Sequence, residues 1–219
     1  MNDNVLRIPL KKNPSIFMDV SPGHYTTGNV HTNYYIDVSN MKANALVARD
    51  IARELSIPYF SSAMVDTIIC MENTKVIGAF LAEELLEPGT MAMNSEGEIH
   101  VITPRSNIDG KLVFFDNEVE WIKNKNILLL MATISGGQTL GSTLECIAYY
   151  NGRITGISSL FSASDKVSQE KIHALFTSDD IPNYEVVRSN KCAMCADGQK
   201  LDAFISSDGY NIYRGENHV

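Results

Sequence analysis

Residues 127–139 read ILLLMATISGGQT, and this stretch decides the fold. It begins with five apolar residues at 127–131, a run typical of a strand buried on both faces of a parallel sheet. SerGlyGly at 135–137 predicts a turn, and from Leu140 onward apolar residues recur at helical spacing. A strand, a glycine loop and a helix in this order form one βα unit, with the strand expected at the centre of the sheet.

Strand-like and helix-like segments alternate on both sides of this unit, which favours an α/β fold with a mainly parallel central sheet flanked by helices. We expect one domain over 1–219, with a small hood contributed by about 1–40 and 180–219 over the strand ends. The remaining strands are predicted at 33–37, 66–71, 100–103, 111–115 and 154–161, and around 172–176 and 183–187. The other two helices are predicted at 42–55 and 76–86.

The helix at 42–55 illustrates how the periodicity is read. Ser39 or Asn40 is available as its N-cap. One apolar stripe is expected to face the core, made of Leu46, Val47, Ile51 and Leu55.

Composition limits the classes of function. The formal net charge is −8, which argues against nucleic acid or an anionic membrane as a partner. No apolar run approaches the roughly 18 residues of a membrane helix, and residues 1–15 do not resemble a signal peptide. The four cysteines are scattered, as expected for a reducing cytoplasm. Cys192 and Cys195 are interpreted as free thiols or packing residues, and the histidines show no metal-ligand spacing, so no metal site is expected.

The loop after the central strand predicts a phosphate site. A helix that begins behind a glycine loop directs backbone N–H groups and the positive end of its dipole at one point. The candidate phosphate-binding residues are Ser135, Gly136, Gly137, Gln138 and Thr139. The alternative is a tight turn that needs glycine only for steric reasons. The loop is neither a Walker A motif nor a dinucleotide-binding fingerprint.

Several segments together resemble one known family. They are ILLLMATISGGQT, GHYT at 23–26, HTNYY at 31–35, RSNIDGKL at 105–112, PNYE at 182–185 and CAMC at 192–195. In this order they are similar to type I phosphoribosyltransferases, and most similar to orotate phosphoribosyltransferase. The resemblance implies that family's fold, a small phosphorylated ligand, a homodimer, and Mg²⁺ as a cofactor that accompanies phosphoribosyl pyrophosphate.

The signature is degenerate where that family holds the ribose. Met131 and Ala132 stand in place of its acidic pair, and hydrogen bonds to charged groups are worth roughly 1.5–3 kcal/mol each. Ser162 and Ala163 fall near an Asp-Arg pair whose Arg helps to recognise the base, so an orotate carboxylate has no evident partner there.

Two further segments carry site candidates by resemblance. The loop Glu72, Asn73, Thr74 and Lys75 occupies the place of the family's pyrophosphate loop, where glycines are usual. Thr74 and Lys75 would crowd a phosphate there, although Lys75 also offers a charge. In the basic hood loop, Arg105 and Lys111 are retained, and in relatives such residues reach the pyrophosphate, often in the neighbouring subunit. Solvated side chains are the alternative for both.

Three functions remain open at this point. The first is a protein that binds a phosphorylated ribose ligand, either a nucleotide or phosphoribosyl pyrophosphate, with weak or lost orotate transferase activity. The second is an active phosphoribosyltransferase of pyrimidine synthesis or salvage that acts on a different base. The third is a structural or partner-binding homodimer without a ligand. The lost acidic pair and the retained loop favour the first, and enzyme status is left open with no catalytic residue assigned.

Overall fold

The computed structural model describes residues 5–28, 30–88, 93–167, 170–206 and 209–212. The chain divides into two compact units. Unit 1 is formed by Met1–Val38 and Ser178–Val219, and unit 2 by Ser39–Thr177. That both belong to one domain with a hood stays a prediction. Among the described residues, no helix has the length and apolar character needed to cross a membrane.

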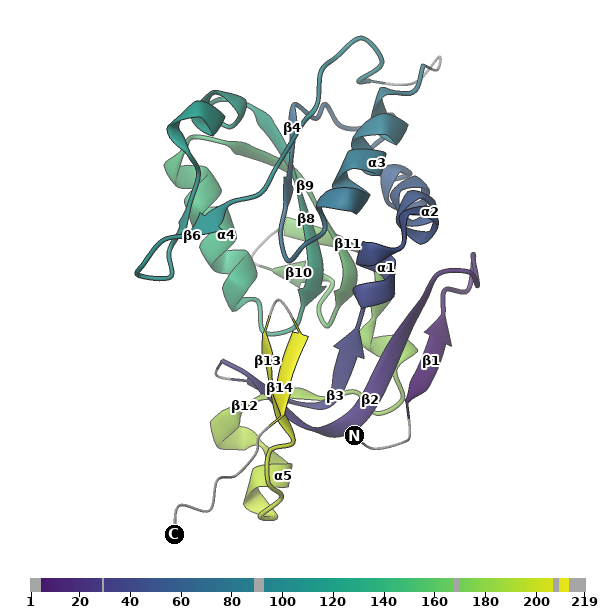
Figure 1. Cartoon of the computed structure of the whole chain (residues 1–219), viewed down its shortest axis with the longest axis vertical. Coiled ribbons are helices and arrows are strands. Elements are labelled where there is room, and N and C mark those ends of the chain that lie inside the picture. Colours follow the sequence, from purple (N-terminus) through teal and green to yellow (C-terminus); the bar gives the residue numbers. More distant parts are fainter. Residues whose placement is uncertain (1–4, 29, 89–92, 168–169, 207–208, 213–219) are drawn as a thin grey trace. The chain divides into compact units, whose positions relative to one another are not determined.

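Unit 2 is built on a sheet whose described strands run in the order β10-β11-β9-β8-β4-β5 (Figure 1). All neighbours pair in parallel except β10, which runs antiparallel to β11. Strand β8 lies in the middle of the parallel strands, so the predicted central position of 127–131 is confirmed. The bounds are β4 (Thr67–Cys70), β5 (His100–Ile102), β8 (Asn126–Ile134), β9 (Arg153–Ser162), β10 (Lys166–Val167) and β11 (Glu170–Thr177).

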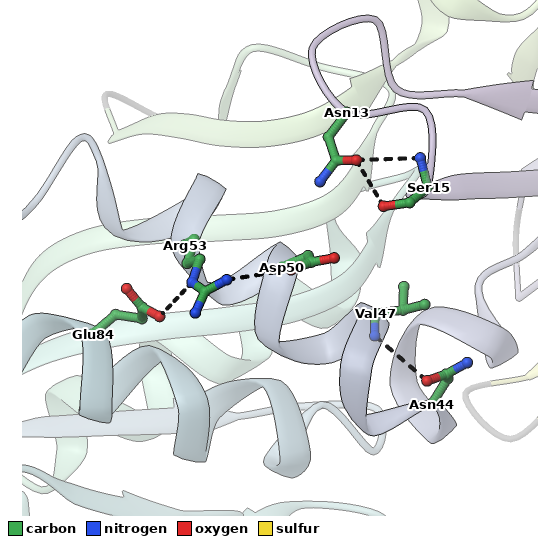
Figure 2. A network of polar contacts seen from close by, with 7 residues as sticks. All are labelled: Asn13, Ser15, Asn44, Val47, Asp50, Arg53 and Glu84. Carbon is green, nitrogen blue, oxygen red and sulfur yellow. Dashed lines mark hydrogen bonds and ion pairs between the residues drawn. The ribbon is translucent and has the colours of Figure 1, made fainter.

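Helices cover both faces of this sheet (Figure 1). Helices α2 (Ala45–Ser56) and α3 (Lys75–Leu86) lie on one face, and α4 (Gln138–Tyr149) lies on the other. An ion pair links the first two, because Arg53 Nε lies 3.0 Å from Glu84 Oε1 (Figure 2). The predicted α/β architecture is therefore confirmed.

The first predicted helix begins later than the sequence analysis placed it. Residues Ser39–Ala43 form a short separate helix, α1, and α2 starts at Ala45. Its N-cap is Asn44, whose Oδ1 accepts hydrogen bonds from the N–H groups of Leu46 and Val47; Figure 2 shows the bond from Val47. With this start, Leu46 is 73% exposed, so the predicted stripe is wrong at that position.

The apolar core of unit 2 follows the alternation of the strands. On the face toward α4, Ile69, Leu129 and Met131 pack with Leu140 and Ile147 of that helix. On the opposite face α3 approaches β4 so closely that a Cβ on Gly78 would meet the sulfur of Cys70 at 2.3 Å. The continuous apolar run of β8 is thus explained by burial on both faces.

The segment after β5 departs from the prediction of one strand at 111–115. Strand β7 (Leu112–Val113) instead pairs with β6 (Arg105–Ser106) in a separate small hairpin. The hairpin turns at Gly110, where φ is +74°, and a 3-10 helix η1 (Asp116–Trp121) follows it. The charged residues of 105–111 therefore lie on a hairpin rather than on the main sheet.

Unit 1 has a sheet of its own, with described strands in the order β12-β3-β2-β13-β14 and β1 paired to β2. The predicted strand around 183–187 belongs here as β12, antiparallel to β3, and not to the central sheet. Tyr25, Tyr35 and Tyr210 form a small aromatic cluster on this sheet. The bounds are β1 (Leu6–Pro9), β2 (Phe17–Thr27), β3 (Val30–Asp37), η2 (Ser178–Asp180), β12 (Val186–Arg188), η3 (Ser189–Lys191), α5 (Ala193–Ala196), β13 (Ala203–Ser206) and β14 (Gly209–Ile212).

Candidate functional site

Two βα junctions lie next to each other in unit 2. Strands β4 and β8 are parallel neighbours, so their carboxyl ends reach the same edge of the sheet. Each strand runs through a short loop into the N-terminus of a helix, α3 after β4 and α4 after β8. In open α/β sheets ligands bind at this edge, and two helix N-termini make it favourable for anions.

Glu72, in the loop after β4, reaches across to the end of β8. Its Oε2 accepts hydrogen bonds from the backbone N–H groups of Ala132, at 3.0 Å, and Thr133, at 2.9 Å. The backbone makes this reach by a left-handed turn, with φ of +54° at Glu72 and +63° at Asn73. The carboxylate therefore lies against the backbone of Ala132, one of the two positions where the resemblance expects acids, and of Thr133.

The charge of Glu72 is only partly compensated. Burial is the largest influence on its carboxyl and raises its pKa, while the bonds from Thr133 and Ala132 and the charge of Lys42 act in the opposite direction. The Lys42 ammonium donates to the backbone carbonyl of Glu72 at 3.1 Å, so a cation lies beside the loop. Both hydrogen bonds described for this carboxylate go to Oε2, so Oε1 is the atom that offers an acceptor to a ligand hydroxyl or a cation.

Met131 and Ala132 are core residues. Met131 is 1% exposed and belongs to the apolar cluster beneath α4, and Ala132 is 2% exposed. Neither side chain reaches solvent at the strand end. The fold therefore uses for packing both positions at which the resemblance expects acids.

The predicted phosphate loop is open at the helix N-terminus. Gly137 is the N-cap of α4 with φ of +75°, and no side chain caps the helix there. The first helical hydrogen bond runs from Gly141 N–H to the Gly137 carbonyl. Gln138 and Thr139 are exposed, and their N–H groups belong to the helix turn that has no intrahelical acceptors. Ser135 is partly buried and Gly136 is exposed.

The four residues of the predicted pyrophosphate loop point in different directions. Thr74 is fully buried, and its hydroxyl donates to the carbonyls of Met71, at 2.7 Å, and Leu130, at 3.2 Å. Its side chain is thus part of the fold and does not face a ligand. Asn73 and Lys75 are exposed, and Lys75 is the first residue of α3. Glu72 reaches the end of β8, at Ala132 and Thr133, whereas Thr74 bonds to Leu130 inside that strand.

The basic residues at 105 and 111 lie on the β6–β7 hairpin, and both are exposed. The Arg105 guanidinium lies 4.3 Å from the centroid of the Phe115 ring, a cation–π contact within the same unit. The backbone N–H of Lys111 donates to Asn107 Oδ1, which fixes the turn. The structure therefore places both on one hairpin, and the contacts described for them include none with Glu72.

The end of β9, next to β8, carries no charge at the two positions singled out in the sequence. Ser162 is 1% exposed, and its hydroxyl donates to the carbonyl of Ser164 at 2.6 Å. The N–H of Ala163 donates to the Ile134 carbonyl of β8 at 2.8 Å. Both residues form hydrogen bonds at the edge of the sheet, and neither has a charged side chain that could bind a nucleobase.

Unit 1 contains a cluster that sequence spacing missed. His24, His31, Cys192 and Cys195 place one ligand atom each within 4.8 Å of all the others. The sequence predicts no metal site here, because the histidines show no metal-ligand spacing. The CysAlaMetCys spacing is visible in the sequence. That His24 and His31, on neighbouring strands, lie beside it is shown only by the fold. His218 lies outside the described residues.

The likeness to solved structures is at the level of the fold. UMP synthase of Leishmania donovani matches with a TM-score of 0.51 and 16% identity, over 73% of this chain and 34% of that chain. Adenine phosphoribosyltransferase from the same organism matches at 0.49 and 14%, over 74% and 78%. Orotate phosphoribosyltransferase from Mycobacterium tuberculosis matches at 0.45 and 10%, over 80% and 90%.

The UMP synthase match, which has the one TM-score above 0.5 among these three, agrees with the parallel sheet and its flanking helices in showing the fold. The chain has the phosphoribosyltransferase fold and is structurally similar to type I phosphoribosyltransferases at low identity. It spans about a third of the length of the UMP synthase that it matches. No family model matches the sequence, and no curated protein matches it significantly.

Proposed function

We propose that unit 2 binds a phosphorylated ribose ligand, a nucleotide or phosphoribosyl pyrophosphate, at the edge formed by β4 and β8, and that its orotate transferase activity is weak or lost. The observation that carries the proposal is the Glu72 carboxylate on the backbone of Ala132 and Thr133. It supplies an acid at the place where the resemblance expects one, but from a different segment of the chain.

The ribose and the phosphate would be held by different parts of this edge. Glu72 would accept from ribose hydroxyls through Oε1, and hydrogen bonds to a charged acceptor are worth about 1.5–3 kcal/mol each. The loop from Ser135 to Thr139 offers backbone N–H groups at an uncapped helix N-terminus, which favours a phosphate. Mg²⁺, which prefers carboxylate and phosphate oxygens, would be held by Glu72 together with the ligand's own pyrophosphate.

Weak transfer follows from what this edge lacks. Phosphoribosyl transfer depends on holding the ligand while positive charge develops at the ribose. The rate therefore depends on carboxylates near the ribose and on a correctly positioned nucleobase. One carboxylate replaces two, and Ser162 and Ala163 provide no cation for orotate. The homodimer with Arg105 and Lys111 at the partner's site stays a prediction.

Orotate turnover tests the activity part of the proposal. With saturating phosphoribosyl pyrophosphate, Mg²⁺ and orotate, we expect a kcat at least a hundredfold below the enzyme median of about 10 s⁻¹. A steady-state assay that follows orotate absorbance measures it. A kcat near that median would show that transfer does not need the missing groups.

The phosphate loop is tested by substituting two glycines that have nearly the same φ. Gly137→Ala places a Cβ at φ of +75° in the phosphate loop, and Gly110→Ala places one at +74° in the exposed β6–β7 turn. Each is expected to cost about 1–2 kcal/mol of stability. Gly137→Ala alone should also weaken ribose 5-phosphate binding at least about tenfold, because it moves the N–H groups that hold the phosphate. Calorimetric titration measures this, and equal affinities in the two variants would exclude the loop as the phosphate site.

A further inference from the structure

The cluster in unit 1 joins segments from both ends of the chain. His24 lies in β2, His31 in β3, Cys192 immediately before α5 and Cys195 within it. His24 Nε2 is 3.0 Å from His31 Nδ1, 3.4 Å from Cys192 Sγ and 3.6 Å from Cys195 Sγ. Cys195 Sγ is 3.3 Å from His31 Nδ1. Four potential ligand atoms therefore converge on one point.

The fold of unit 1 fixes this convergence. Strands β2 and β3 form an antiparallel pair whose register shifts between Pro22 and Tyr25, and His24 lies at this irregularity, which re-aims its side chain. Strand β12 pairs with β3 at His31 and leads through η3 to Cys192. The cluster thus depends on backbone pairing that holds the hairpin and the C-terminal segment together.

His24 is oriented by groups outside the cluster. Its Nδ1 lies 3.0 Å from the carbonyl of Gln199, and because a carbonyl only accepts, Nδ1 must carry the proton. Nε2 of the neutral ring then presents its lone pair to the cluster. Metal-binding histidines are typically held in this way, with the other ring nitrogen donating to a backbone carbonyl or a carboxylate. The backbone N–H of His24 also donates to Asp202 at 2.8 Å.

Hydrogen bonding alone does not account for these contacts. Nε2 of His24 has three neighbours in the cluster, but an imidazole nitrogen has a single lone pair or a single proton and makes one strong hydrogen bond. His24, His31 and Cys192 are buried, so water does not relieve the crowding around this nitrogen. A cation at the centre would satisfy all four atoms at once.

The distances fit a tetrahedral ion. Around zinc, with Zn–N of about 2.0–2.1 Å and Zn–S of about 2.3 Å, two nitrogens lie about 3.3 Å apart and a nitrogen and a sulfur about 3.6 Å apart. The nitrogen–nitrogen separation here is 3.0 Å, and the nitrogen–sulfur separations are 3.3, 3.4 and 3.6 Å. Two imidazoles and two thiolates in this geometry select zinc over oxygen-preferring cations.

We infer that His24, His31, Cys192 and Cys195 bind one Zn²⁺ in a closed structural site. Both cysteines bind as thiolates, so binding releases their two protons while the imidazoles bind through lone pairs. With four protein ligands the ion has no open position, so its role is to tie the β2–β3 hairpin to α5 rather than to catalyse a reaction. Cys195, the exposed member, marks the route by which the ion enters.

Metal analysis of the chain without an affinity tag tests this site. Purified under reducing conditions, the protein should contain about one zinc per chain, as a closed four-ligand site requires. Cys195→Ser and His31→Gln should lose most of it. Cys146→Ser and His100→Gln, a cysteine and a histidine outside the cluster, should retain it. Cobalt in place of zinc should give the strong visible bands and thiolate charge transfer of a tetrahedral site.

Measurements on the wild-type chain test the site even if a variant does not fold. Chelation should lower the melting temperature, and Zn²⁺ but not Mg²⁺ should restore it. Amide exchange should increase in β2, β3 and β12 while the amides of β8 stay protected. A reduced chain that neither contains nor takes up zinc would overturn the proposal. So would a Cys192–Cys195 disulfide in the freshly purified protein, or control variants that lose zinc equally.

Discussion

Replacing Glu72 by glutamine should make the protein more stable at neutral pH and a weaker binder of ribose 5-phosphate. Glutamine can still accept the N–H groups of Ala132 and Thr133 through its oxygen, but it buries no charge. The affinity for the ligand should fall at least about tenfold, because a charged acceptor contributes about 1.5–3 kcal/mol per hydrogen bond. Equilibrium dialysis measures the affinity, and thermal unfolding measures the stability.

The difference in the free energy of unfolding between Glu72→Gln and the wild type should increase with pH. Because burial raises the pKa of Glu72, the folded state keeps its proton to a higher pH than the unfolded chain. Between the ordinary glutamate pKa of about 4.3 and the raised one, the wild-type free energy of unfolding therefore falls as pH increases. The advantage of Glu72→Gln should be absent below this window and complete above it.

The control for this variant is Glu83→Gln, which removes the same charge from an exposed position on α3. It should change neither the affinity nor the pH dependence. If Glu72→Gln binds ribose 5-phosphate as tightly as the wild type, the carboxylate is a structural group and takes no part in ligand binding.

Met131→Asp should abolish folding or come close to it. Met131 is buried in the apolar cluster beneath α4, and an aspartate there has no partner for its charge. An unpaired buried charge costs about 3–5 kcal/mol, a large part of the roughly 5–15 kcal/mol that stabilises a typical domain. Met131→Leu should stay within about 1.5 kcal/mol of the wild type. Urea unfolding measures both, and a stable Met131→Asp protein would mean that the strand end can turn this residue outward.

The sequence predicted the parts of the fold that depend on local pattern. The apolar run of β8, the glycine loop and the apolar stripe of α4 can each be recognised from the spacing of residues within one segment, whichever elements pack against it. The start of α2 was wrong, because Asn44 competes successfully with Ser39 and Asn40 for the cap. The sequence predicted a strand around 183–187 but not its partner, because a short strand carries no information about which sheet it joins; the structure pairs it with β3.

Only the part of the candidate site that lies within one segment of the chain could be predicted from the sequence. The phosphate loop is contiguous in sequence, so its residues could be named. The bond from Glu72 to Ala132 and Thr133 joins residues 60 and 61 positions apart, and it depends on the pairing of β4 with β8. The contact of His24 with Cys195 spans 171 positions, and no spacing rule in one sequence reaches that far.

A calorimetric titration of the wild-type chain tests the proposed ligand site most directly. The four ligands are phosphoribosyl pyrophosphate with Mg²⁺, ribose 5-phosphate, nucleoside monophosphates and orotate. We expect phosphorylated riboses to bind with dissociation constants of about 1 mM or below, which is about −4 kcal/mol or better, and orotate alone not to bind. Orotate binding without any affinity for the phosphorylated riboses, or no binding by any of the four, would contradict the proposal.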